Sequence, residues 1–374
     1  MTGFEFATAA RIIFGSATFA QLAGIAEAHG RHPLVVTGKR PVEGVAGTPF
    51  QVAGEPTIAV VRSGVDVFRQ AECDMVIAIG GGSAIDTGKA IAAAAANPGD
   101  LLDYLEVIGK GKPLEVTPYP FIAVPTTAGT GSEVTRNAVL GSPEEGVKVS
   151  LRSPLMLARV ALVDPDLTAG LPPAVTASTG LDALTQLIEP YVSARANPMT
   201  DGFCLDGIRR VAASLPRAYA NGDDRKARTG MAYASLLGGL ALANAGLGVV
   251  HGFAAPIGGM FDAPHGAICA ALLASGMREN IRALRERAAA GESIDRYGEI
   301  ARILTGDRAA SPEDGAQWVE TLVRRLSVPR ISAWGIRDRH VPELVAKAGR
   351  ASSMKANPIA LTASELTAVL EQSL

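Results

Sequence analysis

The chain has 374 residues, more than one hydrophobic core usually supports, so two domains are expected. Apolar residues make up 48% and charged residues 19%, and the net charge of −2 gives a nucleic-acid or membrane partner no electrostatic support. The three cysteines form no CxxC pair, and the first fifteen residues lack an apolar segment of signal-peptide length, so we expect a cytoplasmic protein.

Short apolar runs alternate with helical runs in the first half of the chain. The runs are rich in β-branched residues and close with glycine, proline or a polar turn, which is typical of buried strands. Strands are expected at 33–37, 57–61, 75–79 and 121–124, with helices at 64–71 and 84–96. Continuous apolar strands separated by helices predict a parallel sheet covered on both faces.

After Asp164-Pro165 the strand signals fade and helical periodicity dominates. Helices are expected at 174–192, 198–218, 227–243 and 266–283. The chain is therefore divided into an α/β domain, residues 1–164, and an all-α domain, residues 165–374. The stretch 229–261 has no Lys, Arg, Asp or Glu, but its many glycines and His251 favour buried helices over a membrane span.

A glycine-rich turn follows the strand at 75–79. Gly80, Gly81 and Gly82 allow close backbone approach to a pyrophosphate, and the next helix offers unpaired N–H groups. The turn alone could be a tight connection without a ligand. The segment 125–133, PTTAGTGSE, brings further hydroxyls and glycines to the same edge of the sheet, where open α/β folds bind ligands. The two turns together predict a nucleotide site.

The first predicted strand ends in Gly38, Lys39 and Arg40. Sites that prefer NAD commonly place an acidic residue after an early strand, where it accepts the ribose hydroxyls. Two cations here would instead favour a 2′-phosphate. The alternative is that both are solvated surface charges, and we favour NADP over NAD.

Two histidines lie in an almost uncharged region, where His251 and His265 each precede a glycine. Upstream, Asp182 is a lone carboxylate among apolar residues, with Gln186 one helical turn later. A buried carboxylate needs a partner, and two imidazoles with a divalent cation would supply one. Satisfied core histidines and a locally bonded Asp182 are the alternative, and the residues alone leave both open.

Several ordered motifs resemble those of the iron-containing (group III) alcohol dehydrogenases. These are GGGSAIDTGKAIA, FIAVPTTAGTGSEVT, ALVDPDLTAGLPP, STGLDALTQLIEPYVS and VVHGFAAPIGGMFDAPHG. The resemblance covers nearly the whole chain. It implies an amino-terminal dinucleotide-binding domain with a parallel sheet and a carboxy-terminal helical domain that carries a divalent metal and the substrate.

The resemblance also implies site residues. The pyrophosphate turn would use Gly81, Gly82 and Ser83, with Asp86 and Lys89 nearby, and the next loop would contact the cofactor. That loop and its surroundings contribute Thr126, Thr127, Ser132 and, near the ribose, Lys148. Gly38 stands where NAD-using members often carry aspartate, which again favours NADP.

The metal site implied by the resemblance has an aspartate, a histidine four residues later, and two further histidines. Asp182, His251 and His265 match three positions, whereas Gln186 replaces the fourth with a neutral and weaker ligand. Many members also have a proton-relaying histidine at the position of Ala255. We expect Fe²⁺ or Zn²⁺ bound by Asp182, Gln186, His251 and His265.

These features predict an NAD(P)-dependent oxidoreductase that interconverts an alcohol and an aldehyde or ketone. Asp182, His251 and His265 would act in catalysis by holding the metal against the substrate oxygen. The alternatives are a metal-free reductase similar to maleylacetate reductases and a nucleotide-binding relative that has lost catalysis. The resemblance further implies a small-molecule substrate and a homodimer or larger homo-oligomer.

Overall fold

The computed structural model describes residues 3–39, 42–288 and 291–374. The chain divides into two compact units. The α/β unit comprises Phe6–Thr127 and Gly131–Ala169, and the helical unit comprises residues 3–5, Ala128–Thr130 and Gly170–Leu374. The expected domain boundary between residues 164 and 165 stands slightly before this division.

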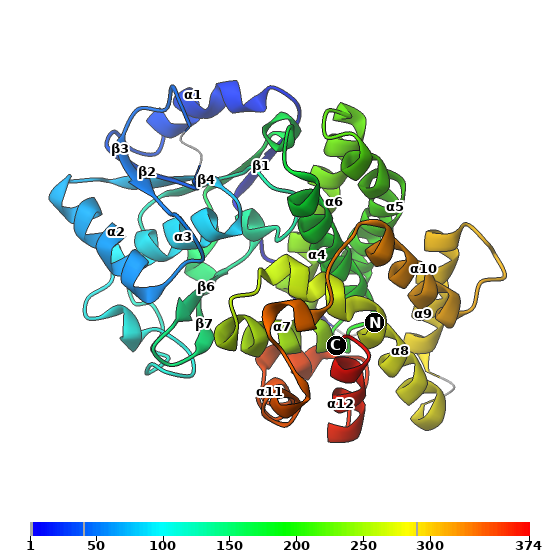
Figure 1. Cartoon of the computed structure of the whole chain (residues 1–374). Helices are drawn as coiled ribbons and strands as arrows, with labels where there is room; N and C mark the ends of the chain where they lie inside the picture. Colours follow the sequence, from blue (N-terminus) through cyan, green and yellow to red (C-terminus); the bar gives the residue numbers. More distant parts are fainter. Residues whose placement is uncertain (1–2, 40–41, 289–290) are drawn as a thin grey trace. The chain divides into compact units, whose positions relative to one another are not determined.

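A six-stranded, all-parallel sheet forms the centre of the α/β unit (Figure 1). Its spatial order is β1 (Arg11–Phe14), β8 (Val160–Val163), β5 (Phe121–Pro125), β4 (Met75–Gly80), β2 (Pro33–Thr37) and β3 (Thr48–Gln51). Thr37 pairs with Ile79, and Gly80 pairs with Pro125. The carboxyl ends of the three central strands therefore lie at one edge, and the expected parallel sheet is confirmed.

The described residues of this unit also form three α-helices and a hairpin. They are α1 (Leu22–Glu27), α2 (Ile58–Gln70), α3 (Gly82–Ala96) and the antiparallel pair β6 (Asn137–Ser142) and β7 (Val147–Arg152). Gly88 lets α3 approach the sheet closely, because a Cβ atom there would stand 2.8 Å from the Cβ of Ala78 and 3.1 Å from Phe121.

The strand expected at 57–61 is wrong, because this segment begins helix α2. Thr57 is its N-cap, with Oγ1 accepting a hydrogen bond from the N–H of Val60. The buried positions Ile58, Val61, Val65 and Phe68 follow helical spacing. A short β-branched run gave the strand pattern, but the amphipathic period extending beyond it decides the structure.

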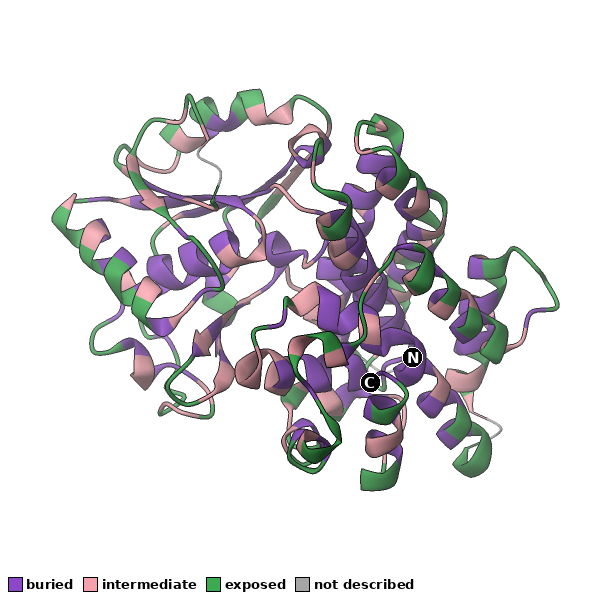
Figure 2. Ribbon diagram, in the orientation of Figure 1, coloured by how far each residue is buried: buried purple, intermediate pink, exposed green. Residues whose placement is uncertain are grey.

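The helical unit contains nine α-helices among the residues that the structure describes. They are α4 (Pro173–Val192), α5 (Pro198–Ala220), α6 (Arg225–Ala245), α7 (Val249–Met260), α8 (His265–Arg287), α9 (Glu292–Thr305), α10 (Pro312–Arg325), α11 (Val341–Ala348) and α12 (Ala363–Glu371). Helix α4 is buried along most of its length (Figure 2). Its polar side chains therefore need partners inside the protein.

Within the described residues, no single helix is both long and apolar enough to cross a bilayer. Helices α6 and α7 pass such a test only as a pair, and they are bent by 98° at the break between them. This pair contains the uncharged stretch 229–261. The side chains of α6 and α7 are largely buried in the unit.

We expect Gly88→Ala to lower the free energy of unfolding by about 1–3 kcal/mol, because the added methyl group overpacks the contact between α3 and the sheet. Urea unfolding measures the effect. Gly202→Ala is the matched control, since nothing lies within 4 Å of a Cβ placed there in α5. It should be neutral or stabilise by up to about 1 kcal/mol. Equal effects of the two substitutions would contradict this packing argument.

Candidate cofactor and metal sites

The glycine-rich turn connects β4 to α3. Gly81 is the N-cap of α3, and no side chain caps this terminus. The first helical bond runs from Ala84 N–H to the carbonyl of Gly81, so the preceding N–H groups point out of the helix end. A Cβ on Gly81 would stand 3.3 Å from Thr127 Oγ1. The turn thus presents backbone donors and a hydroxyl side by side, a combination suited to an anion.

The loop after β5 lies against this turn. Thr126 N–H donates to the carbonyl of Gly80 at 2.9 Å, which joins the two segments directly. Thr126 and Thr127 are both half-buried at the carboxyl end of β5. The structure therefore brings the two sequence motifs together: Gly81 lies beside Thr127, and Gly82 and Ser83 are the first residues of α3.

Lys89 anchors the continuation of this loop. Its buried ammonium donates to the carbonyls of Ser132 and Asn137, each at 2.8 Å, and to Thr135 Oγ1 at 2.9 Å. Burial lowers the pKa of Lys89 to about 8, although Asp86 opposes that shift. The side chain remains charged at neutral pH and fixes the loop to α3, and Ser132 takes part through its carbonyl.

Asp86 holds the β6–β7 hairpin, accepting a hydrogen bond from Val139 N–H at 3.0 Å. Its other oxygen lies 3.9 Å from Lys89 Nζ. Glu133 is also buried, and burial raises its pKa to about 7 against the opposing pull of Lys89. Asp86 therefore supports the structure around the glycine-rich turn by holding the hairpin, and its carboxylate is engaged within the protein.

Gly38 borders the same edge of the sheet, since its backbone nitrogen would stand 3.3 Å from a Cβ on Gly80. Lys39 is exposed, and its carbonyl accepts from Gln51 Nε2 at 2.9 Å. Arg40 lies outside the described residues. Lys148, on β7, forms an ion pair with Glu55 at 2.9 Å.

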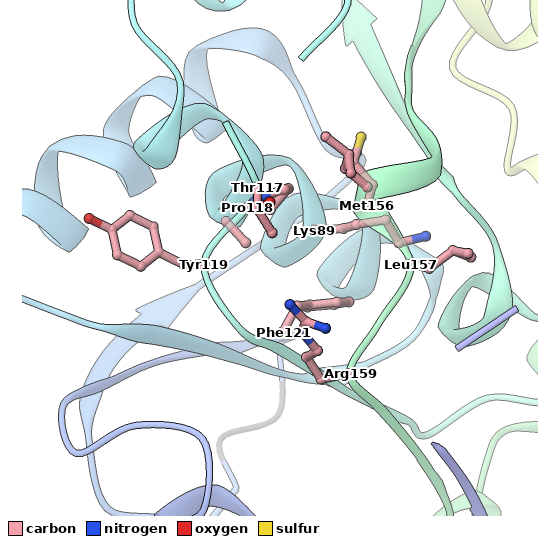
Figure 3. A pocket seen from close by; sticks show the side chains of 10 residues that line it. Lys89, Thr117, Pro118, Tyr119, Phe121, Met156, Leu157 and Arg159 are labelled. Carbon is pink, nitrogen blue, oxygen red and sulfur yellow. The ribbon is translucent and has the colours of Figure 1, made fainter. Parts of the chain in front are cut away.

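A small pocket of about 20 Å³ lies elsewhere in this unit (Figure 3). It is lined by Lys89, Ala92, Thr117, Pro118, Tyr119, Phe121, Leu155, Met156, Leu157 and Arg159. Phe121 begins β5, so the pocket is at the amino end of that strand, opposite the glycine turn. Its volume suits about one water molecule and is too small for a nucleotide.

A cluster of candidate metal ligands occupies the helical unit. Asp182 on α4 has Oδ1 at 3.6 Å from Nε2 of His251 and at 3.7 Å from Nε2 of His265. His251 comes from α7, and His265 is the first residue of α8. One possible ligand atom from each of these residues and from Cys269 lies within 4.8 Å of all the others.

Two buried oxygens in this region have no hydrogen-bond partner in the described structure, namely Asp182 Oδ1 and Gln186 Oε1. Gln186 lies one turn after Asp182 on α4, and its side chain contacts that carboxylate. An unpartnered buried oxygen is costly. Because a cation would satisfy Asp182 Oδ1, the donor set fits a divalent metal.

Glu189 orients one of the histidines. This buried carboxylate contacts Nδ1 of His251 at 2.6 Å and accepts from Val250 N–H at 2.7 Å. With Nδ1 engaged, Nε2 of His251 faces the cluster, the arrangement that metal-ligating histidines commonly have. Asn357 also caps α7, with its side-chain oxygen accepting from Val249 N–H at 3.0 Å.

The charges of the cluster depend on one another. Burial favours the neutral form of Asp182, but His265 and His251 hold its pKa below the ordinary value. Burial opposes the charge on His251, yet Cys269 and Glu189 raise its pKa well above the ordinary value. Against the same burial, Cys269 and Asp182 raise the pKa of His265 to about 8. The cluster therefore stabilises positive charge at its centre.

Glu189 and Cys269 are not among the site residues predicted from the sequence. Both follow a noted residue at helical spacing: Glu189 is seven residues after Asp182, and Cys269 is four residues after His265. This helical spacing is the feature of the sequence by which both residues could have been predicted.

Comparison with known proteins identifies the class. The sequence model described as iron-containing alcohol dehydrogenase matches residues 9–165, and the model of the carboxy-terminal region of the same family matches residues 176–374. The chain belongs to the iron-containing alcohol dehydrogenases, as its motifs predicted, and is an oxidoreductase that acts on an alcohol–carbonyl pair.

Individual relatives agree with this assignment. Alcohol dehydrogenase 4 of Saccharomyces cerevisiae is 37% identical over 319 residues, covering 85% of this chain and 80% of the relative. The 1,3-propanediol dehydrogenase of Klebsiella pneumoniae is 38% identical over 328 residues, covering 86% and 81%. A crystal structure of a 1,3-propanediol oxidoreductase superposes with a TM-score of 0.89 at 34% identity, covering 100% of both chains.

Proposed function

We propose that this protein is a metal-dependent alcohol dehydrogenase that transfers hydride directly between C4 of a nicotinamide and the carbonyl carbon of a small aldehyde or ketone. The buried cluster in the helical unit carries the proposal. Asp182 presents an unpartnered oxygen to two imidazole nitrogens at 3.6 and 3.7 Å, an arrangement of oxygen and nitrogen donors that suits a divalent cation.

Asp182, His251 and His265 would hold the metal, with Gln186 beside them. A bound divalent ion supplies Lewis acidity toward the substrate oxygen. Glu189 keeps Nε2 of His251 directed at the cluster. These residues provide charge and orientation, and the nicotinamide provides the hydride.

The glycine turn and the threonine loop would bind the cofactor. The N–H groups at Gly81, Gly82 and Ser83 suit a pyrophosphate, and the hydroxyls of Thr126 and Thr127 lie next to them. Lys89 keeps the loop in place through three hydrogen bonds. A cytoplasmic location and a homodimer or larger homo-oligomer stay predictions from the sequence.

Stripping the metal should lower alcohol oxidation and aldehyde reduction at least about a hundredfold, since Lewis-acid assistance supplies several kcal/mol. Metal analysis of protein purified without chelator should show about one ion per chain, and returning Fe²⁺ or Zn²⁺ should restore activity. A protein that retains full activity without bound metal would support the metal-free reductase instead. Cofactor binding without turnover of any carbonyl compound would support a non-catalytic relative.

Replacing Glu189 with glutamine should weaken metal binding about 10–100-fold, because His251 loses the carboxylate that orients it. Competition titration of the metal-free protein with a chromophoric chelator measures the affinity. Glu299→Gln is the control, since Glu299 accepts a hydrogen bond from Tyr191 and lies on α9, which contributes none of the four cluster residues. Both variants should remain folded by circular dichroism. An unchanged affinity for Glu189→Gln would refute the positioning role.

We further propose that NADP is preferred to NAD, because Gly38 leaves room for a 2′-phosphate and Lys39 is exposed beside it. Gly38→Asp should reduce the NADP-to-NAD ratio of kcat/KM by at least about tenfold, a change of about 1.4 kcal/mol. Nothing lies within 4 Å of a Cβ at Gly38, so the backbone tolerates the substitution. Gly38→Ala controls for size. A wild-type preference for NAD would contradict the proposal.

A further inference from the structure

Cys269 lies inside the cluster, although nothing in the proposed function so far uses it. It follows His265 by one turn of α8, so both side chains lie on one face of that helix. Its side chain is fully buried. Cys269 Sγ is 3.8 Å from Nε2 of His251 and 3.7 Å from Nε2 of His265.

These distances match the edges of a coordination tetrahedron. Ligand atoms at about 2.0–2.3 Å from a zinc ion stand roughly 3.3–3.7 Å from one another. The two imidazole nitrogens are 3.6 and 3.7 Å from Asp182 Oδ1, and 3.8 and 3.7 Å from Cys269 Sγ. The oxygen and the sulfur therefore have nearly the same relation to both imidazoles. All four ligand atoms lie within 4.8 Å of one another, so they are gathered closely enough to surround one ion.

Gln186 is a poorer candidate for the fourth ligand. Gln186 lies one helical turn after Asp182 on α4, and its side chain contacts the Asp182 carboxylate, to which its amide N–H group can donate. A neutral amide oxygen is also a weaker ligand than a thiolate for Zn²⁺. Gln186 can therefore orient Asp182, while another residue completes the ligand set.

We propose that the thiolate of Cys269 is the fourth protein ligand, giving an Asp182–His251–His265–Cys269 site that selects Zn²⁺ over Fe²⁺. The inference rests on the metal site of the proposed function and specifies which residues are its ligands. Thiolate is a soft ligand, and soft ligands favour zinc over the harder ferrous ion. With Cys269 the site has four strong ligands. With Gln186 in the fourth position it would have only three.

The surroundings of Cys204 provide a comparison within the same unit. Cys204 on α5 is also fully buried, but it is not part of the cluster of possible ligands. A buried thiol of this kind packs as a small apolar group. Cys204 is therefore the matched control for Cys269.

X-ray absorption of the zinc-loaded full-length protein tests the proposal without any substitution. One sulfur scatterer at about 2.3 Å, together with nitrogen and oxygen at about 2.0–2.1 Å, is the expected result. Cobalt loading should give a sulfur-to-metal charge-transfer band in the near ultraviolet. Stoichiometric metal with only nitrogen and oxygen scatterers would overturn the role of Cys269 and leave the metal-dependent function standing. A protein that binds no metal would overturn both.

Cys269→Ser should remove the sulfur scatterer and the charge-transfer band, and should weaken zinc affinity at least about tenfold, the lower limit even for loss of an outer-shell partner. Cys204→Ser should change none of these. The ratio of zinc to iron affinity should fall in Cys269→Ser only. If Cys269→Ser fails to fold, the wild-type absorption spectrum still decides the matter. Retention of the sulfur signal in a folded Cys269→Ser protein would refute the assignment.

Discussion

The helical unit is arranged around one constraint, the burial of acidic groups on α4. Asp182 and Glu189 are both almost fully buried, and carboxylates in such positions need positive partners. His251 lies between them, with Nδ1 at 2.6 Å from Glu189 and Nε2 at 3.6 Å from Asp182. Helices α7 and α8 must therefore bring their histidines to α4. The same requirement that balances the buried charge gathers side chains that could hold a divalent ion.

The α/β unit solves a related problem with a buried cation. Lys89 makes three hydrogen bonds from within α3, two of them to backbone carbonyls. These carbonyls belong to Ser132 and Asn137, in the segment that follows the threonine loop, so a buried charge on α3 fixes where that segment lies. In both units a buried charged side chain and its hydrogen-bond or ion-pair partners fix the position of the candidate site residues. A loop held this way can present hydroxyls with little loss of entropy on binding.

The sequence was sufficient for the parallel sheet, because β2, β4 and β5 are continuous apolar runs that end in turns. The prediction was wrong at α2. The short run 57–61 has the composition of a strand, but the apolar residues that follow it recur with a helical period. Strands β1, β3 and β8 have only four residues each, and the β6–β7 hairpin is half-buried, so their sequence patterns are weak. The motif residues Asp182, His251 and His265 do meet. Cys269 was missed because a single cysteine in an apolar segment cannot be recognised as a possible ligand until the fold shows which residues of other helices lie beside it.

The cap on α7 has a consequence for synthesis. Asn357 accepts from Val249 N–H and is bonded to Asn280, so the helix that carries His251 is tied to a segment 108 residues further along the chain. A nascent polypeptide contains Asp182, His251, His265 and Cys269 well before it contains Asn357. Until that residue emerges from the ribosome, the start of α7 lacks one of its caps. Complete capping of the helix that carries His251 therefore requires almost the whole chain.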